Sequence, residues 1–323
     1  MSKNSAYNKQ PGPSIAIVGG GSIGVAFAVV FSRAKRQVRI FDPDPDCRAD
    51  FLQATEFRLK ELDGFNLLNE SVDIIMQRIS VHDQLSDAVK GAIYVQECAP
   101  ENLEIKRELF SQLDELTASK TILASASSAI PMSQISDGLS GKNRCLVAHP
   151  GNPPFLISVI EVVPSAHTDP EVTQGAIKLL TDCSLDPIVV HKEIEGFVFN
   201  RLQGALLREA YCLVRDGIAS VDDVDKIVRD GLGLRWSFMG PFETADLNTR
   251  GGIGSHAEKM GPAYARMGAE RGQNDPWTKE LVSKVETARR ELVPLDQWAQ
   301  RVAWRDRQLM ELISHRMHKD EEN

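Results

Sequence analysis

A glycine-rich turn between two apolar segments is the feature that most constrains the fold of this 323-residue chain. Residues 14–18 are mainly β-branched and apolar, and Gly19 opens the sequence Gly-Gly-Gly-Ser-Ile-Gly, which leads into the apolar residues 25–31. This order predicts a strand, a tight turn and a helix. Three glycines have G-x-G-x-x-G spacing. The first permits the turn, the second lets a pyrophosphate approach the backbone at the helix N-terminus, and the third lets the helix pack on the strand.

A second apolar segment, residues 37–41, ends at Asp42. An acid at this distance from the glycines binds the two hydroxyls of a ribose and repels a phosphate on that ribose. The following residues add Asp44 and Asp46 rather than an arginine. Together with the glycine turn, this pattern predicts a dinucleotide site that prefers NAD to NADP.

Strand and helix patterns alternate as far as about Lys192, and helical patterns alone follow. Further strands are predicted at 92–96, 121–124, 144–148, 159–163 and 187–190, and helices at 44–78 (broken near Asp63-Gly64), 101–116, 168–182, 196–215 and 295–317. Such alternation predicts an α/β, Rossmann-type, doubly wound, mostly parallel sheet followed by an all-helical C-terminal domain. We expect a flexible tail at 1–13, an NAD-binding domain at 14–192 and a helical substrate and dimerisation domain at 193–323.

Charge and composition argue against several classes of partner. The formal net charge of −8 argues against binding to nucleic acid or to an anionic membrane. No apolar run approaches the roughly 18 residues of a membrane helix. The five cysteines are odd in number, scattered and without metal-ligand spacing, so we expect a reducing, cytoplasmic location and no metal site.

A histidine and a carboxylate form the clearest candidate for acid–base chemistry. His149 lies in Ala-His-Pro-Gly-Asn-Pro-Pro, and Glu161 follows after a short apolar run. A carboxylate can fix the imidazole tautomer, so that the other ring nitrogen takes a substrate proton. Taken alone, a histidine of this kind is more often structural than catalytic.

Five segments, in their order and spacing, resemble the 3-hydroxyacyl-CoA dehydrogenase superfamily. They are GGGSIG (19–24), QECAPEN (96–102), ASASS (124–128), AHPGNPP (148–154) and GFVFNRL (196–202). Residues 231–244 and 304–306 are similar to its λ-crystallin branch, which includes L-gulonate 3-dehydrogenase. The resemblance covers nearly the whole chain and implies an NAD-dependent dehydrogenase that forms a homodimer through its helical domain.

The resemblance also implies roles for individual residues. His149 takes the hydroxyl proton, Glu161 stabilises the resulting imidazolium, and Ser128 and Asn200 hydrogen-bond the reacting oxygen. Glu97 resembles the acid near the cofactor, although a carboxylate at a strand end can equally cap a helix. Cofactor contacts are therefore expected at Gly19, Gly21, Ser22, Ile23, Gly24, Asp42 and Glu97.

Arg235, in a glycine-flanked segment, is a candidate to hold a substrate carboxylate through two hydrogen bonds. Two positions depart from the family pattern. Ala126 stands where the fatty-acid enzymes usually have asparagine, and Gly151 replaces a larger apolar residue, which we expect to widen the pocket beside the base. Lys106 and Arg107 are predicted on a solvated helix face.

Three functions are compatible with these features. The first is NAD-dependent oxidation of a small, free 3-hydroxy acid, L-gulonate-like or carnitine-type, for which Arg235 provides a carboxylate anchor. The second is a 3-hydroxyacyl-CoA dehydrogenase, since Arg58 and Lys60 lie in the helical region that contacts CoA in that family. The third is a non-enzymatic, crystallin-like or NAD-sensing protein. Such a protein has no need of all four catalytic residues, so we expect a dehydrogenase.

Overall fold

The computed structural model describes residues 14–237, 239–248 and 252–271, with shorter stretches between 280 and 314. Contacts divide the chain into two units, Met1–Arg201 with Trp304–Asn323 and Leu202–Ala303. The tail predicted at 1–13 lies outside the described residues.

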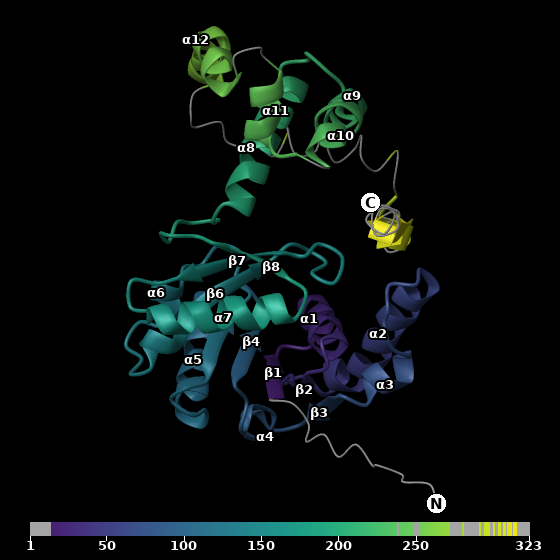
Figure 1. Ribbon diagram of the computed structural model, residues 1–323, viewed down its shortest axis with the longest axis vertical. Coiled ribbons are helices and arrows are strands. Elements are labelled where there is room, and N and C mark those ends of the chain that lie inside the picture. Colours follow the sequence, from purple (N-terminus) through teal and green to yellow (C-terminus); the bar gives the residue numbers. More distant parts are fainter. Residues whose placement is uncertain are drawn as a thin grey trace, which may run out of the picture. The chain divides into compact units, whose positions relative to one another are not determined.

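The first unit is built on an eight-stranded sheet in the order β3-β2-β1-β4-β5-β6-β7-β8 (Figure 1). Its strands are β1 (Ser14–Val18), β2 (Gln37–Phe41), β3 (Ile79–His82), β4 (Tyr94–Glu97), β5 (Ile122–Ser125), β6 (Cys145–Pro150), β7 (Val159–Pro164) and β8 (Asp186–Val189). Neighbouring strands are parallel except β6 and β7, which are antiparallel. The predicted Rossmann-type sheet is thus confirmed. The carboxyl ends of β1, β2, β4 and β5 meet at one edge, where ligands of such sheets bind.

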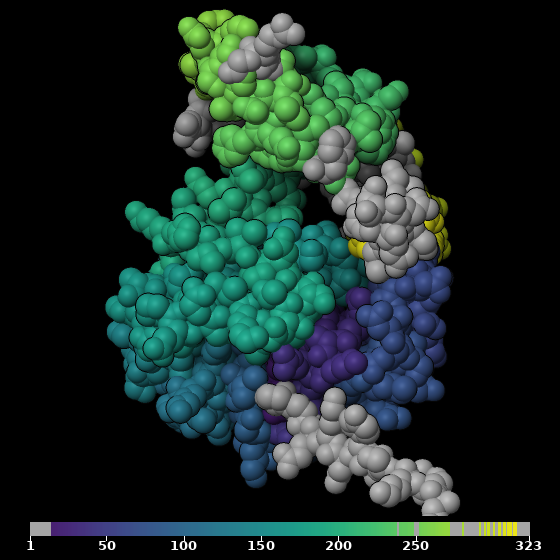
Figure 2. Space-filling model, viewed as in Figure 1, coloured from purple at the N-terminus to yellow at the C-terminus, as the bar shows by residue number. Residues whose placement is uncertain are grey.

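Helices cover both faces of this sheet. They are α1 (Ser22–Arg33), α2 (Pro45–Gly64), α3 (Val72–Met76), α4 (Leu85–Val89), α5 (Leu103–Leu116), α6 (Met132–Ile135) and α7 (Pro170–Asp182), with a short 3₁₀ turn at Lys142–Arg144. Helices α1 and α7 pack into one apolar core, and α4, α5 and α6 into the core on the other face. Figure 2 shows α7 in teal, and α2 and α3 in blue, at the surface of this unit.

A third apolar cluster joins α2 and α3 to the last part of the chain. Leu59 and Leu62 of α2 and Ile75 of α3 are buried together with Met310. The break predicted near Gly64 is confirmed, since α2 ends there. Strand β3 and helix α4 escaped prediction because each is only four or five residues long, too short to show a period.

The second unit begins at Leu202, inside α8 (Phe199–Arg215). Its further elements are α9 (Val221–Lys226), a π-helical turn (Ile227–Leu232), α10 (Gly233–Trp236), α11 (Pro241–Leu247), α12 (Gly252–Arg271) and a 3₁₀ turn (Leu295–Gln297). Every element described here is helical, as predicted, and most of the helix predicted at 295–317 lies outside the described residues. Within the described part of the chain, no helix has the length and apolar character to cross a membrane.

Helix α8 begins later than the residue 196 predicted from the sequence. Gly196 and Phe197 have φ angles of 74° and 46°. This left-handed conformation interrupts a right-handed helix. The helix therefore starts only at Phe199.

Candidate functional site

The glycine turn after β1 has the geometry that its spacing predicts. Gly19 has a φ of +111°, and a Cβ there would lie 2.6 Å from the backbone of Cys98. A Cβ on Gly24 would lie 1.9 Å from the carbonyl oxygen of Gly19. These two glycines therefore allow the turn and the close packing of α1, since any other residue clashes with backbone. Around Gly21, in contrast, a Cβ meets no atom within 4 Å.

The N-terminus of α1 fits the diphosphate of a dinucleotide. Gly21 is its N-cap, no side chain caps the helix, and the first turn contains no acid. Gly21 and Ser22 are exposed, and Ile23 is half-buried against the core. The backbone N–H groups of this turn are thus open to an anion, which the helix dipole stabilises further.

Asp42 lies beside the glycine turn, directly after β2. Its Oδ2 accepts a hydrogen bond from the N–H of Gly20 over 2.6 Å, and its Oδ1 accepts one from the N–H of Asp44 over 2.8 Å. Arg48 donates to the carbonyl oxygens of Asp42 and Pro43. The half-buried carboxylate is therefore fixed at the carboxyl edge of the sheet, in the position suited to ribose hydroxyls.

His149 and Glu161 meet across the antiparallel strands β6 and β7. They are register partners, and His149 Nδ1 lies 2.7 Å from Glu161 Oε2. Both side chains are buried, and the His149 ring contacts the rings of Phe197 and Phe199 at centroid distances of 5.8 and 6.2 Å. With Nδ1 engaged by a carboxylate, Nε2 is the ring nitrogen left for a substrate proton.

Glu161 also holds the start of helix α8. Its Oε1 accepts hydrogen bonds from the N–H groups of Val198 and Phe199 over 2.7 and 3.0 Å. Burial opposes ionisation of this carboxyl, but the hydrogen bonds from His149, Phe199 and Val198 together hold the pKa of Glu161 below its usual range. A carboxylate that stays ionised is what an imidazolium at His149 needs.

Ser128 and Asn200 come together at the same edge of the sheet. Ser128 lies in the loop after β5, and Asn200 lies in the first turn of α8. The Asn200 side-chain amide donates to the Ser128 carbonyl oxygen over 2.9 Å. Both side chains are half-buried.

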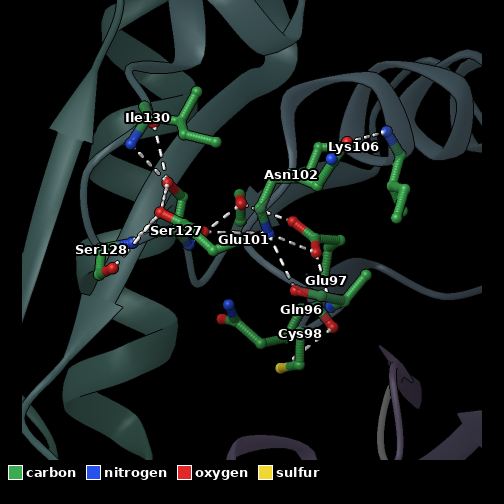
Figure 3. A network of polar contacts seen from close by, with 12 residues as sticks. Gln96, Glu97, Cys98, Glu101, Asn102, Lys106, Ser127, Ser128 and Ile130 are labelled. Atoms are coloured by element: carbon green, nitrogen blue, oxygen red, sulfur yellow. Dashed lines mark hydrogen bonds and ion pairs between the residues drawn. The ribbon is translucent and has the colours of Figure 1, made fainter.

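Glu97 is fully buried at the end of β4 (Figure 3). Its Oε1 accepts hydrogen bonds from Lys106 Nζ and the N–H of Ala99, and its Oε2 accepts one from the Ser125 hydroxyl. Burial raises the pKa of Glu97, although Lys106 and these hydrogen bonds act in the opposite direction. The carboxylate faces α5 inside the protein, and direct contact with a cofactor stays a prediction.

Lys106 corrects one expectation. It was predicted on a solvated face of α5, but it is 1% exposed because its ammonium turns inward to Glu97. Arg107 is exposed, as predicted, and its Nε donates to the Gln134 carbonyl oxygen. The helical pattern alone does not reveal that a lysine has a buried partner nine residues earlier.

Glu101, which no sequence pattern singled out, contacts the loop of a candidate site residue. Its carboxylate accepts hydrogen bonds from the loop that carries Ser128 (Figure 3). The one sequence signal was its position in the QECAPEN segment, just before Asn102, which caps α5. Nothing local in the sequence links it to a loop some twenty-seven residues later.

Gly151 is closely packed, since Ile157 Cγ2 lies 2.5 Å from the position that a Cβ on Gly151 would take. A neighbour therefore fills the space of the missing side chain, and a wider pocket beside the base stays a prediction. Ala126 is half-buried and packs against the core on the α1 face.

Arg235 lies in α10 of the second unit. Its Nη1 donates to Asn248 Oδ1 over 3.2 Å, and the residue is half-buried. Contact of Arg235 with a substrate stays a prediction.

Comparisons with known proteins agree with this geometry. The sequence models of the 3-hydroxyacyl-CoA dehydrogenase NAD binding domain and C-terminal domain match residues 14–194 and 196–292. The lambda-crystallin homolog of Bos taurus is 38% identical over 312 residues, 95% of this chain and 97% of the relative. The L-carnitine dehydrogenase of Oceanobacillus iheyensis is 35% identical over 82% of this chain and 83% of its own.

A solved structure is similar over nearly the whole chain. It is that of an NAD⁺-dependent 5-formyl-3-hydroxy-2-methylpyridine 4-carboxylic acid 5-dehydrogenase, with a TM-score of 0.81 and 28% identity over 93% of this chain and 96% of the other. The glycine turn, the open helix N-terminus and these matches lead to one conclusion. The chain belongs to the 3-hydroxyacyl-CoA dehydrogenase family and is an NAD-dependent oxidoreductase that acts on CH–OH groups.

Proposed function

We propose that the protein oxidises the 3-hydroxyl group of a small, free, L-gulonate-like hydroxy acid to a 3-keto acid, with His149 as the general base. The observation that carries the proposal is the buried His149–Glu161 pair, with Nδ1 and Oε2 2.7 Å apart. Ser128 and Asn200, joined by a hydrogen bond, provide polar groups for the reacting oxygen.

When bound, NAD supplies the acceptor for the hydride that leaves the carbon bearing the hydroxyl group. The glycine turn and Asp42 are the residues that would hold NAD. His149 Nε2 accepts the hydroxyl proton as the C–H bond breaks and the C=O bond forms. The ionised Glu161 stabilises the imidazolium that results. Ser128 and Asn200 hydrogen-bond the substrate oxygen and orient the C–H bond.

The CoA alternative has less support from helix α2. Arg58 Nη1 lies 3.6 Å from Oδ2 of the buried Asp306 and 3.9 Å from Glu61 Oε2. Lys60 forms an ion pair with Glu56 over 2.5 Å. The contact with a buried carboxylate makes Arg58 less available to the phosphates of CoA, whereas the exposed Lys60 pair is weak and argues neither way.

Carnitine-type substrates are a second candidate within the same reaction class. The L-carnitine dehydrogenase relative, 35% identical, supports it. Carnitine shares the 3-hydroxy acid group with gulonate and adds a quaternary ammonium, so the same proton acceptor and the same carboxylate anchor suit both.

Initial rates decide among these functions. The purified protein is assayed with NAD and gulonate, carnitine, 3-hydroxybutyrate or 3-hydroxybutyryl-CoA. We expect the highest kcat/KM with gulonate among the free acids and a lower kcat/KM with 3-hydroxybutyryl-CoA. A preference for the thioester supports the acyl-CoA function, and no turnover with any of them supports a crystallin-like protein.

A homodimer formed through the helical unit and a cytoplasmic location complete the proposal. Within the described part of this unit, Phe242, Leu247 and Leu234 are 82%, 68% and 65% exposed. Apolar side chains this exposed are typical of an interface with another chain. Sedimentation of the purified protein at micromolar concentration tests the dimer, and a monomer there contradicts it.

A further inference from the structure

The Glu101 carboxylate accepts several hydrogen bonds from the loop that carries Ser128 (Figure 3). Glu101 Oε1 accepts hydrogen bonds from Ser127 Oγ over 2.8 Å, the N–H of Ser128 over 2.9 Å and the N–H of Ala129 over 3.0 Å. The Ser128 hydroxyl donates to the same oxygen over 3.3 Å. Glu101 follows β4 and the loop follows β5, so this contact joins two loops at the carboxyl edge of the sheet.

A buried cation lies behind Glu101. Lys106 Nζ is 2.8 Å from Glu97 Oε1 and 3.6 Å from Glu101 Oε2. It also donates to the Ala99 carbonyl oxygen over 3.1 Å. Because the fully buried Glu97 and the Ala99 carbonyl oxygen hold the Lys106 ammonium in place, its charge attracts the Glu101 carboxylate from a fixed position.

Neighbouring donors and a lysine stabilise the ionised form of Glu101. Burial opposes ionisation, but the hydrogen bond from Ser127, the charge of Lys106 and the N–H groups of Ala129 and Ser128 hold the pKa of Glu101 below its usual range. Hydrogen bonds to an ionised acceptor are about twice as strong as neutral ones. The Ser127 hydroxyl and the N–H groups of Ser128 and Ala129 thus share one charged oxygen.

Ser128 is held from both sides. Its N–H donates to Glu101, and its carbonyl oxygen accepts from the Asn200 side chain. With both backbone groups engaged, rotation of the side chain moves the Ser128 hydroxyl from its long, 3.3 Å contact with Glu101 to a substrate oxygen. Asn200 is oriented by the same carbonyl oxygen.

We propose that Glu101, supported by the buried Lys106, is a positioning residue that fixes the Ser128 loop so that Ser128 and Asn200 reach the same substrate oxygen. This inference rests on the proposed function, in which these two residues bind the reacting oxygen. Groups that stabilise a developing charge must be placed to within a fraction of an ångström, and a shift of about 1 Å costs up to a hundredfold in rate.

Substitution of Glu101 tests this role. Glu101→Ala removes the acceptor of all the loop donors and lowers kcat about tenfold or more. Glu101→Gln keeps one carbonyl oxygen for those donors and restores part of the rate. Glu104→Ala is the matched control, because it removes an exposed carboxylate three residues away, in the first turn of α5. A kcat of Glu101→Ala within about twofold of the wild-type value overturns the proposal.

A double-mutant cycle with Ser128→Ala separates positioning from general stability. If Glu101 acts in part through the Ser128 hydroxyl, adding Glu101→Ala to the Ser128→Ala variant lowers kcat by a smaller factor than it does in the wild type. Losses that multiply in full show that the two residues act independently and overturn the proposal. Glu101→Gln replaces Glu101→Ala in the cycle if the alanine variant does not fold.

Hydrogen exchange gives a readout that needs no turnover. In Glu101→Ala we expect faster exchange of the Ser128 and Ala129 amides, with the amides of β6 protected as in the wild type. Unchanged exchange at Ser128 overturns the proposal. If the wild-type protein oxidises no hydroxy acid, the proposed function fails, while the exchange data still decide whether Glu101 holds this loop.

Discussion

His149 and Glu161 are directly opposite residues of the antiparallel pair β6–β7, and 2.7 Å separates His149 Nδ1 from Glu161 Oε2. Opposite residues of an antiparallel pair place their side chains on the same face of the sheet. The pair is therefore oriented by strand register inside the core rather than by a loop. Reversal of the chain between β6 and β7 is what makes this register possible.

Replacement of His149 tests its role as the base. We expect His149→Gln to lower kcat by roughly 10²–10⁴-fold, the usual effect of losing a general base, because glutamine cannot take the proton. NADH affinity, followed by fluorescence, stays unchanged because the glycine turn and Asp42 are intact. A near-normal kcat at neutral pH excludes His149 as the base.

The lowered pKa of Glu161 predicts a dependence of stability on pH. A carboxyl whose folded pKa lies below its unfolded value of about 4.3 stabilises the folded state above that value. This contribution is lost as the pH falls through the lowered folded pKa. Glu161→Gln cannot titrate, so its unfolding free energy falls less steeply with acid. Urea unfolding between about pH 3 and pH 7 measures the unfolding free energy of the wild type and of Glu161→Gln. An equally steep fall of this free energy with acid in both proteins contradicts the prediction.

Asp42 is expected to set the cofactor preference. Asp42→Asn keeps an oxygen that can accept from Gly20 but removes the charge that repels a ribose phosphate. The ratio of kcat/KM for NAD to that for NADP shrinks as a result. Asp63→Asn, a change to an exposed acid at the far end of α2, leaves the ratio unaltered. A wild-type enzyme that uses both cofactors equally rules out this role for Asp42.

Arg235 is predicted to bind the substrate carboxylate. Arg235→Leu then raises the KM for the free hydroxy acid strongly, with NAD binding untouched, and Arg235→Lys rescues only part because an ammonium cannot make the two-pronged contact. The KM for 3-hydroxybutyryl-CoA changes much less, since its reacting end has no carboxylate. Arg229→Leu, which breaks an exposed ion pair with Asp230, is the control. Unchanged kinetics with the best free acid remove Arg235 from the site.

Loss of Lys106 is predicted to be costly. Lys106→Met leaves the carboxylate of Glu97 buried without its cation, and removal of one partner of a buried ion pair costs roughly 3–5 kcal/mol in the free energy of unfolding. The double variant Glu97→Gln/Lys106→Met recovers part of this loss, because a neutral amide tolerates burial better than a lone charge. Denaturant unfolding of the three proteins provides the measurement. A single variant as stable as the wild type refutes the prediction.

Local patterns were enough to predict several features of the site. The glycine turn, its helix and Asp42 lie within thirty residues of one another, and their geometry follows from the clash of a Cβ at Gly19 and Gly24 with nearby backbone. His149 and Glu161 occupy neighbouring strands joined by a short connection, so a sequence motif could pair them. Their residue types already specify the chemistry.

The tertiary structure alone decided the rest. Lys106 has the helical setting of a solvated residue, and only the packing of α5 on β4 brings it to Glu97. Packing likewise lets Ile157 occupy the space beside Gly151, and brings Glu101 to the Ser128 loop. The sequence by itself determined the cofactor turn and the residue types of the proposed acid–base pair, because both depend on short-range sterics and side-chain chemistry. Partners brought together by the order of strands in the sheet leave no local signal, since their contact exists only after the chain has folded.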